Sequence, residues 1–158
     1  MARRSEVSAG ILAFRRKPRL ELLLAHPGGP YWGNKDDGAW SIPKGNVESG
    51  DLLVCAKREF NEETGLVAAG PFFALTPLRQ KNGKMVHAFA LEADFDLSAF
   101  VSNMFEMEWP PHSGKHQNFP EVDRIAYFGL SAARRKILSG QRPFIEELVQ
   151  QLKKKVSV

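Results

Sequence analysis

The sequence predicts an α/β protein, an α/β/α sandwich around a mixed β-sheet. Apolar runs at residues 7–15 and 20–25 predict an opening pair of strands. A helical segment with an apolar stripe follows at 51–64, and two further helical segments close the chain after the last strand. Because the chain has 158 residues and shows no linker or internal repeat, we expect one domain over residues 1–158.

The N-terminal part of the chain alternates strands with a loop. The turn at Lys17-Pro18-Arg19 separates the first two apolar runs and predicts that they pair antiparallel. Residues 26–39 hold several glycines and prolines, which predict a loop rather than a regular element. A short strand is expected at residues 40–42.

Local signals at both ends define the first helix. Asp51 is a favourable N-cap and Gly65 a favourable C-terminal stop. Leu52, Ala56 and Phe60 recur every four residues and therefore share one face, which we expect to pack against the sheet.

The second half of the chain continues the sheet and ends in helices. Lys81-Asn82-Gly83 predicts a hairpin turn, and Pro110-Pro111 predicts the end of a strand. Strands are expected at residues 66–78, 84–95, 104–109 and 124–128, and helices at 131–138 and 143–154.

Composition and charge exclude several classes of protein. The chain carries 22 Lys and Arg against 18 Asp and Glu, and the net charge of +4 favours anionic substrates. It has no motif of interleaved basic and aromatic residues, so we expect no nucleic-acid partner. No apolar run approaches the roughly 18–20 residues that span a bilayer, so no membrane partner is expected. The single cysteine, Cys55, cannot form an internal disulfide, which fits a cytoplasmic protein.

Three carboxylates near the end of the first helix point to a metal site. Glu59, Glu62 and Glu63 are spaced three and four residues apart and can project toward one side of the helix. Like charges this close repel one another, and a divalent cation would relieve the repulsion. Mg²⁺ prefers oxygen ligands and shares its sites with phosphates, so we expect Mg²⁺, or Mn²⁺ in its place.

A cation and a flexible backbone precede the helix. The turn Pro43-Lys44-Gly45 would place a lysine and a close-approaching backbone beside the metal, as phosphate binding requires. Arg58 can brace a neighbouring carboxylate such as Glu62.

The segment from Gly45 to Leu66 resembles the box of the Nudix hydrolase family, G-x5-E-x7-R-E-U-x-E-E-x-G-U, where U is an apolar residue. The second half, Arg58 to Leu66, matches residue for residue when Phe60 is accepted at U. Two departures precede it: Asp51 stands at the first Glu, and six residues rather than seven separate it from Arg58. The resemblance implies a Nudix-type sandwich whose helix starts slightly differently.

The resemblance also implies a reaction and roles for the residues. Water would attack a phosphorus in a nucleoside diphosphate linked to a group X. Glu59 and Glu63 would hold the metal, Glu62 would contact it directly or through water, and the Gly45 carbonyl would complete the inner ring. Arg58, Glu59 and Glu62 are the expected catalytic residues of the box.

Family members often take one more carboxylate from outside the box. Glu106 and Glu108 alternate on a predicted strand and face the same side, and Glu108 lies beside the prolines that stop it. We rank Glu108 first, as catalytic and metal-binding, and Glu106 second. Glu121 is the third candidate.

Aromatic residues are candidates for stacking a nucleobase. Tyr31 and Trp32 lie in the predicted loop at 26–39, and Phe119 lies late in the chain. We expect Lys44, Tyr31 and Trp32 to bind substrate. The four histidines show no metal-ligand spacing, so none is given a role.

We therefore expect a nucleotide-like small-molecule substrate, either a nucleoside triphosphate or a dinucleoside polyphosphate. The alternatives are a nucleotide-sugar or ADP-ribose pyrophosphatase and a non-catalytic Nudix module that binds a nucleotide. The protein is expected to be a monomer or a homodimer.

Overall fold

A seven-stranded mixed sheet forms the centre of the computed structural model, which describes residues 6–156. The first five and last two residues of the predicted domain lie outside that range. The strand order is β4-β6-β1-β2-β9, with β3 paired to β1 and β5 paired to β6. Strand β1 pairs parallel with β6 and antiparallel with β2 and β3. The strands of this sheet are β1 (Val7–Arg15), β2 (Glu21–Pro27), β3 (Lys44–Asn46), β4 (Phe72–Ala74), β5 (Leu78–Arg79), β6 (Met85–Glu92) and β9 (Val122–Gly129).

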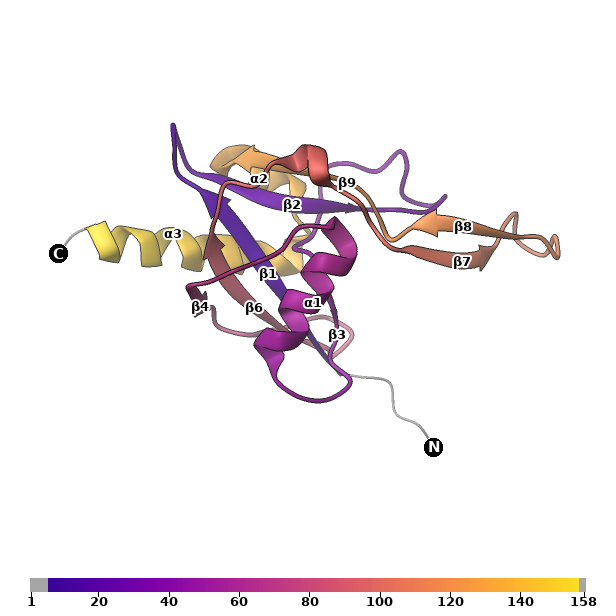
Figure 1. The fold of residues 1–158 in the computed structure, drawn as a ribbon, viewed down its shortest axis with the longest axis horizontal. Helices are drawn as coiled ribbons and strands as arrows, with labels where there is room; N and C mark the ends of the chain where they lie inside the picture. The colour runs from indigo at the N-terminus through magenta and orange to yellow at the C-terminus, as the bar shows by residue number, and fades with distance from the viewer. Residues whose placement is uncertain (1–5, 157–158) are drawn as a thin grey trace.

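Both faces of the sheet are covered, which confirms the predicted sandwich. Helix α1 (Leu52–Thr64) lies on one face, and α2 (Leu130–Lys136) and α3 (Arg142–Val156) lie on the other (Figure 1). Alternate residues of β1 enter different cores because successive strand side chains point to opposite faces. Leu12 packs in the core under α3, whereas Ile11 packs in the core under α1. The apolar runs of the first two strands are thus explained by burial on both sides.

Helix α1 begins and ends where the sequence predicts. The Asp51 side chain accepts a hydrogen bond from the Val54 amide, and Gly65 takes the left-handed conformation at φ 75°. Ala56 and Phe60 are fully buried against the sheet. Among its carboxylates, Glu62 is exposed, whereas Glu59 and Glu63 are half-buried beside this packed face.

Two predicted strands are shorter than expected or take another form. Residues 66–78 contain only β4 and β5, because the cap that ends α1 and the intervening prolines leave few residues to pair with β6. Residues 40–42 form isolated bridges instead of a strand, with Ser41 facing Ala25 and Trp40 facing Ile137. The buried Gln141 side chain substitutes for a strand partner by accepting from the Ile42 amide at 3.0 Å.

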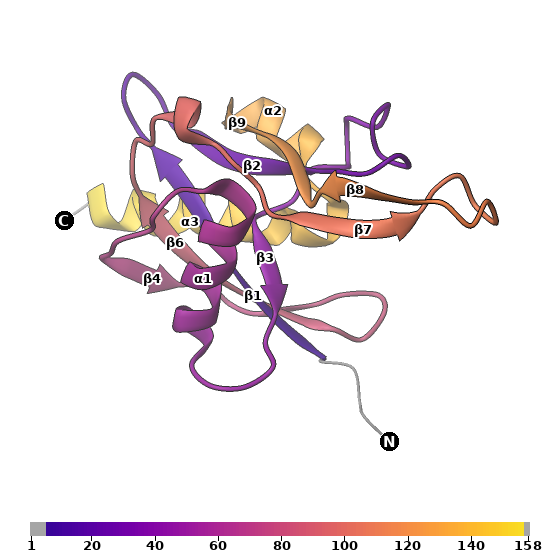
Figure 2. The same cartoon turned by 45° about the vertical axis from the view of Figure 1, so that its right-hand side comes forward.

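A separate hairpin projects from the body of the molecule. Strands β7 (Met104–Glu108) and β8 (His116–Pro120) pair only with each other, and residues 104–120 extend away from the sheet in both views (Figure 2). We call residues 104–120 the hairpin arm. Strand β8 is not predicted by the sequence, because His116, Gln117 and Asn118 carry no apolar alternation. Within residues 6–156, no helix is long and apolar enough to cross a membrane.

Candidate active site

Five carboxylates from two distant parts of the chain border one cleft of about 440 Å³. Three come from α1, Glu48 lies in the loop before that helix, and Glu121 lies between β8 and β9. The cleft is therefore acidic, with cations from β3 and α1 at its edge. The residues around it are Lys44, Gly45, Asn46, Glu48, Arg58, Glu59, Glu62, Glu63, Asn103 and Glu121.

Strand β3 brings its backbone against α1 at Gly45. A methyl group at this position would overlap the carboxylate of Glu59, which would have to move aside. Pairing with β1, where Gly45 faces Ala9, holds the strand in place. This contact brings the Gly45 backbone into the immediate neighbourhood of Glu59, as the predicted metal site requires.

Glu63 lies deepest among the acidic side chains. Burial, reinforced by the charges of Glu121 and Glu59, raises the pKa of Glu63 to about 8. The backbone amide of Lys44 donates to its carboxylate and opposes the rise. Burial likewise lowers the pKa of Lys44, although the charge of Glu63 counters this effect. The lysine and the carboxylate thus lie together in a poorly solvated part of the cleft.

Glu59 and Arg58 form the outer part of the same group. Burial and the charge of Glu62 raise the pKa of Glu59, whereas Arg58 opposes the rise. Arg58 places a guanidinium nitrogen 3.4 Å from a Glu59 carboxylate oxygen and another 3.9 Å from Glu62. Its expected bracing contact therefore reaches both carboxylates, with the shorter distance to Glu59.

Backbone hydrogen bonds fix Glu121 beside α1. Its amide donates to the Asn103 carbonyl at 2.9 Å, and its carbonyl accepts from the Gly28 amide at 2.9 Å. Asn103 in turn donates to the carbonyl of Glu62 at 2.8 Å. Burial, followed by the charges of Glu59 and Glu62, raises the pKa of Glu121. Glu121 is thus held against the helix through main-chain contacts that no sequence motif marks.

The structure does not bring Glu108 or Glu106 to the cleft. The carboxylate of Glu108 accepts from the amides of His112 at 2.9 Å and Gly114 at 3.3 Å, at the turn of the hairpin arm. Glu106 lies 3.3 Å from the imidazole of His116 on the neighbouring strand. The ranking of Glu108 as the first candidate for the carboxylate from outside the box is corrected, because its strand leaves the body of the protein. Glu121 stands where Glu108 was expected.

The donors of the cleft fit a hard divalent cation. Glu59, Glu63 and Glu121 each have a raised pKa, and like-charged neighbours contribute in every case. Carboxylate and carbonyl oxygens without sulfur or imidazole are the ligands that Mg²⁺ and Mn²⁺ take. Among the described residues, no three His, Cys, Asp or Glu side chains are already grouped as a metal-binding set. A bound cation would therefore draw the carboxylates closer together.

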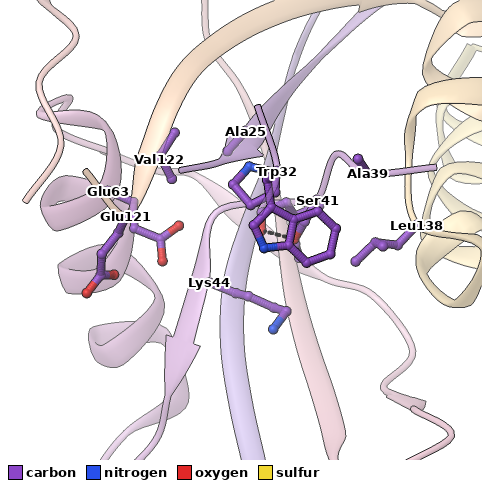
Figure 3. Close-up of a pocket in the computed structure, with 11 residues that line it drawn as sticks. Ala25, Trp32, Ala39, Ser41, Lys44, Glu63, Glu121, Val122 and Leu138 are labelled. Atoms are coloured by element: carbon purple, nitrogen blue, oxygen red, sulfur yellow. Dashed lines mark hydrogen bonds between the residues drawn. The ribbon is translucent and has the colours of Figure 1, made fainter. Parts of the chain in front are cut away.

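A second, more apolar pocket of about 240 Å³ adjoins the cleft and shares Lys44, Glu63 and Glu121 with it. The carboxylates of Glu63 and Glu121 lie on one side, and the Trp32 indole lies toward the other, near Leu138 (Figure 3). We call this space the Trp32 pocket. It is lined by Ala25, Pro27, Trp32, Ala39, Ser41, Ile42, Lys44, Glu63, Glu121, Val122 and Leu138.

The three aromatic residues predicted to stack a base, Tyr31, Trp32 and Phe119, lie in different surroundings. Trp32 lines the pocket, whereas the Tyr31 ring packs edge to face on Trp109 of the hairpin arm at 5.1 Å. Phe119 packs on Phe105 within the arm. His26, which received no role from the sequence, is buried between the Asp123 carboxylate and the Lys35 carbonyl. It anchors the loop that carries Trp32.

Sequence reasoning missed two amide side chains at the cleft. Asn46 follows Gly45 directly, so its position next to the box turn was the available signal. Asn103 has no such signal, because it reaches the cleft through a connection between distant elements.

Solved structures share this fold at low sequence identity. The Nudix domain of Shewanella oneidensis NrtR, complexed with ADP ribose, has a TM-score of 0.66 and 15% identity, covering 96% of this chain and 90% of that one. An Ap4A hydrolase from C. elegans has a TM-score of 0.60 and 21% identity, covering 93% of this chain and 98% of that one.

Sequence comparisons point the same way. An RNA pyrophosphohydrolase of Caulobacter vibrioides is 38% identical over 60 residues, which is 34% of this chain and 35% of that protein. The chain thus aligns with about a third of the length of this curated relative. The model of the NUDIX domain matches residues 4–148, a range that includes the sheet, α1 and Glu121. With the box on α1 and the family model over most of its length, the chain belongs to the Nudix family.

Proposed function

We propose that this protein is a metal-dependent pyrophosphohydrolase that cleaves a diphosphate linkage in a nucleoside diphosphate-X substrate. The observation that carries the proposal is the meeting of Glu59, Glu62, Glu63 and Glu121 around one cleft that opens onto the Trp32 pocket. The cleft offers oxygen ligands for a cation, and the pocket offers an aromatic surface for a base. Family membership supports the same chemistry.

The side chains of the cleft have distinct roles in this proposal. Glu59 and Glu63, with the Gly45 carbonyl, hold Mg²⁺ or Mn²⁺, and Glu62 adds a direct or water-mediated contact. The metal supplies a polarised phosphoryl oxygen and a water of lowered pKa. Arg58 orients the carboxylates of Glu59 and Glu62, which it already approaches.

Glu121 replaces Glu108 as the carboxylate from outside the box. Its side chain borders the same cleft as Glu59 and Glu62, and burial favours the protonated state by raising its pKa. A carboxylate of this kind accepts a proton from water more readily than a fully solvated one. We therefore assign proton transfer, or support of a second metal, to Glu121.

Lys44 and Trp32 place the substrate. Lys44 lines both spaces, so its ammonium group can contact phosphate oxygens between the metal and the base. Trp32 contributes a half-exposed indole to the adjoining pocket, where a purine or pyrimidine can stack. The Trp32 pocket and the acidic cleft together suit a substrate with a base at one end and phosphates at the other.

Nucleoside triphosphates and dinucleoside polyphosphates are the substrates we favour. Both place a base next to a chain of phosphates, and the C. elegans neighbour is an Ap4A hydrolase. Nucleotide sugars and ADP-ribose are the alternative class, since the NrtR domain binds ADP ribose. The relation to an RNA pyrophosphohydrolase adds a 5′-triphosphorylated RNA as a third class for the test. Cys55 is a free, buried thiol, which supports the proposed cytoplasmic location.

A substrate panel tests the proposal. The protein is incubated with ATP, GTP, diadenosine tetraphosphate, ADP-ribose, UDP-glucose and a 5′-triphosphorylated RNA, with Mg²⁺, Mn²⁺ or EDTA. We expect metal-dependent hydrolysis of the first three substrates: ATP and GTP would release pyrophosphate or phosphate, and diadenosine tetraphosphate would give two adenosine nucleotides. The matched variant Glu63→Gln should lose most of this turnover. Binding of these nucleotides without turnover in any metal would instead identify a non-catalytic nucleotide-binding module.

A further inference from the structure

The apolar side of the hairpin arm faces the loop that carries Trp32. Phe105, Met107 and Trp109 alternate with Glu106 and Glu108, so these two sets lie on opposite faces of the arm. The Phe105 ring lies so close to Gly29 that a methyl group there would stand 3.1 Å from it. Farther along the arm, Trp109 meets Tyr31 edge to face at 5.1 Å between ring centroids. The arm and the loop therefore pack on each other at two successive points.

The loop that carries these contacts is tied to the body of the protein on either side of residues 30–34. Residues 30–34 lie in turns, and Gly33 has open space around it. Before this stretch, the Gly28 amide is tied to the Glu121 carbonyl. After it, the Lys35 carbonyl contacts the buried His26 at 2.6 Å. Trp32 lies midway between the two anchors.

Among the described residues, the only ring that Tyr31 contacts is that of Trp109. Tyr31 remains 58% exposed, and its ring is directed to Trp109 instead of the pocket. Trp32 is the next residue and lines the pocket. Because Tyr31 packs on the arm while Trp32 lines the pocket, one ring can hold the loop while the other contacts a ligand.

We propose that Trp109 is a positioning residue: it holds Tyr31 and thereby fixes Trp32 at the pocket, so that the hairpin arm sets the affinity for the nucleobase. The inference rests on the proposed function for its substrate, and on the geometry of the arm for its mechanism. An isolated two-stranded hairpin is marginally stable in water, so the contact orders the arm and the loop together. The arm does not supply a group to the reaction.

Kinetics of a Trp109→Ala variant of the full chain test the inference. With diadenosine tetraphosphate as the probe, KM should rise about threefold to tenfold, the range expected when an aromatic pair is lost. The kcat should stay within about twofold, because the carboxylates are untouched. Trp109→Phe keeps a ring for Tyr31 and should restore KM. Met104→Ala is the control, since this exposed residue lies on the other face of the arm.

A double variant separates bracing from a direct contact with substrate. If Trp109 acts through Trp32, then adding Trp109→Ala to Trp32→Ala should leave KM as it is in the single Trp32→Ala variant. Fully additive effects would overturn the proposal. A fall in kcat at unchanged KM would also overturn it, because the arm would then act on Glu121 at its base.

Hydrogen exchange tests the bracing without any substrate. The amide of Trp32 bonds to the Gly29 carbonyl and that of Lys35 to the Trp32 carbonyl. Both should exchange faster in Trp109→Ala, while amides of α1 stay protected. Unchanged exchange at both sites would refute the inference even if the enzyme is active. Faster exchange in a protein that hydrolyses none of the substrates would support the bracing and count against the proposed activity alone.

Discussion

Replacing Glu63 by Gln should stabilise the metal-free protein at neutral and alkaline pH. Burial and two neighbouring carboxylates raise the pKa of Glu63 from 4.5 to about 8, so its ionisation opposes folding. The contribution of protonated Glu63 to the free energy of unfolding is fully present below pH 4.5 and is lost as the pH rises through about 8. Gln imitates the protonated side chain at every pH and keeps an oxygen for the Lys44 amide.

The size of the effect follows from the two pKa values. Each pH unit between them removes about 1.4 kcal/mol of stability from the wild-type protein, which amounts to about 3 kcal/mol at pH 7. The Gln variant should therefore gain about 3 kcal/mol over wild type at pH 7 in EDTA, and less than about 1 kcal/mol at pH 5. Urea unfolding at both pH values measures the difference.

Divalent metal should make wild type more stable than Glu63→Gln. At pH 7, Mn²⁺ or Mg²⁺ at a thousand times Kd stabilises wild type through binding by about 4.1 kcal/mol, more than the advantage of Glu63→Gln, and should add little to the variant. Glu106→Gln on the solvent-exposed arm is the control and should follow wild type. The reasoning fails if Glu63→Gln is no more stable than wild type in EDTA at pH 8.5, or if it retains wild-type turnover at limiting metal.

Three further outcomes are expected from the structure. Glu121→Gln should lower kcat on the order of 10²–10⁴-fold in a steady-state assay at saturating metal, whereas Glu108→Gln should be nearly silent; the reverse would restore the arm as the source of the base. Lys44→Ala should raise KM about tenfold, equal to about 1.4 kcal/mol of lost binding, and an unchanged KM would exclude a phosphate contact. Asp51→Ala removes the helix N-cap and should cost about 1 kcal/mol in urea unfolding, while an unchanged free energy would show that the cap contributes nothing.

Local signals predicted the elements that depend on short-range physics. Helix α1 has both bounds correct because Asp51 and Gly65 act within one helical turn of its ends. The first two strands are recognised because they are apolar on both faces. The three box carboxylates share a cleft because helical spacing alone brings them to one side.

Glu121 could not be ranked correctly because its position depends on long-range contacts. It reaches the cleft through the Asn103 carbonyl and the Gly28 amide, residues far from it in sequence. Glu108 has a comparable local setting, at the end of a strand before prolines. Alternation predicts which face of a strand a side chain occupies, but it does not predict that the strand leaves the sheet. Strand β8 was missed for a related reason, since its polar residues pair only within the projecting arm.

The segment from Gly45 to Arg58 tolerates a length different from the family pattern. The positions of Glu59, Glu62 and Glu63 are counted back from the Gly65 cap, so the residue missing between Asp51 and Arg58 shortens the start of the helix and leaves their phase on it intact. Ser49 and Gly50 are exposed, and nothing crowds Gly50. The connection from Gly45 to α1 is thus a natural attachment point for a fluorophore, close enough to the cleft to register an arriving cation and separate from the residues that would hold it.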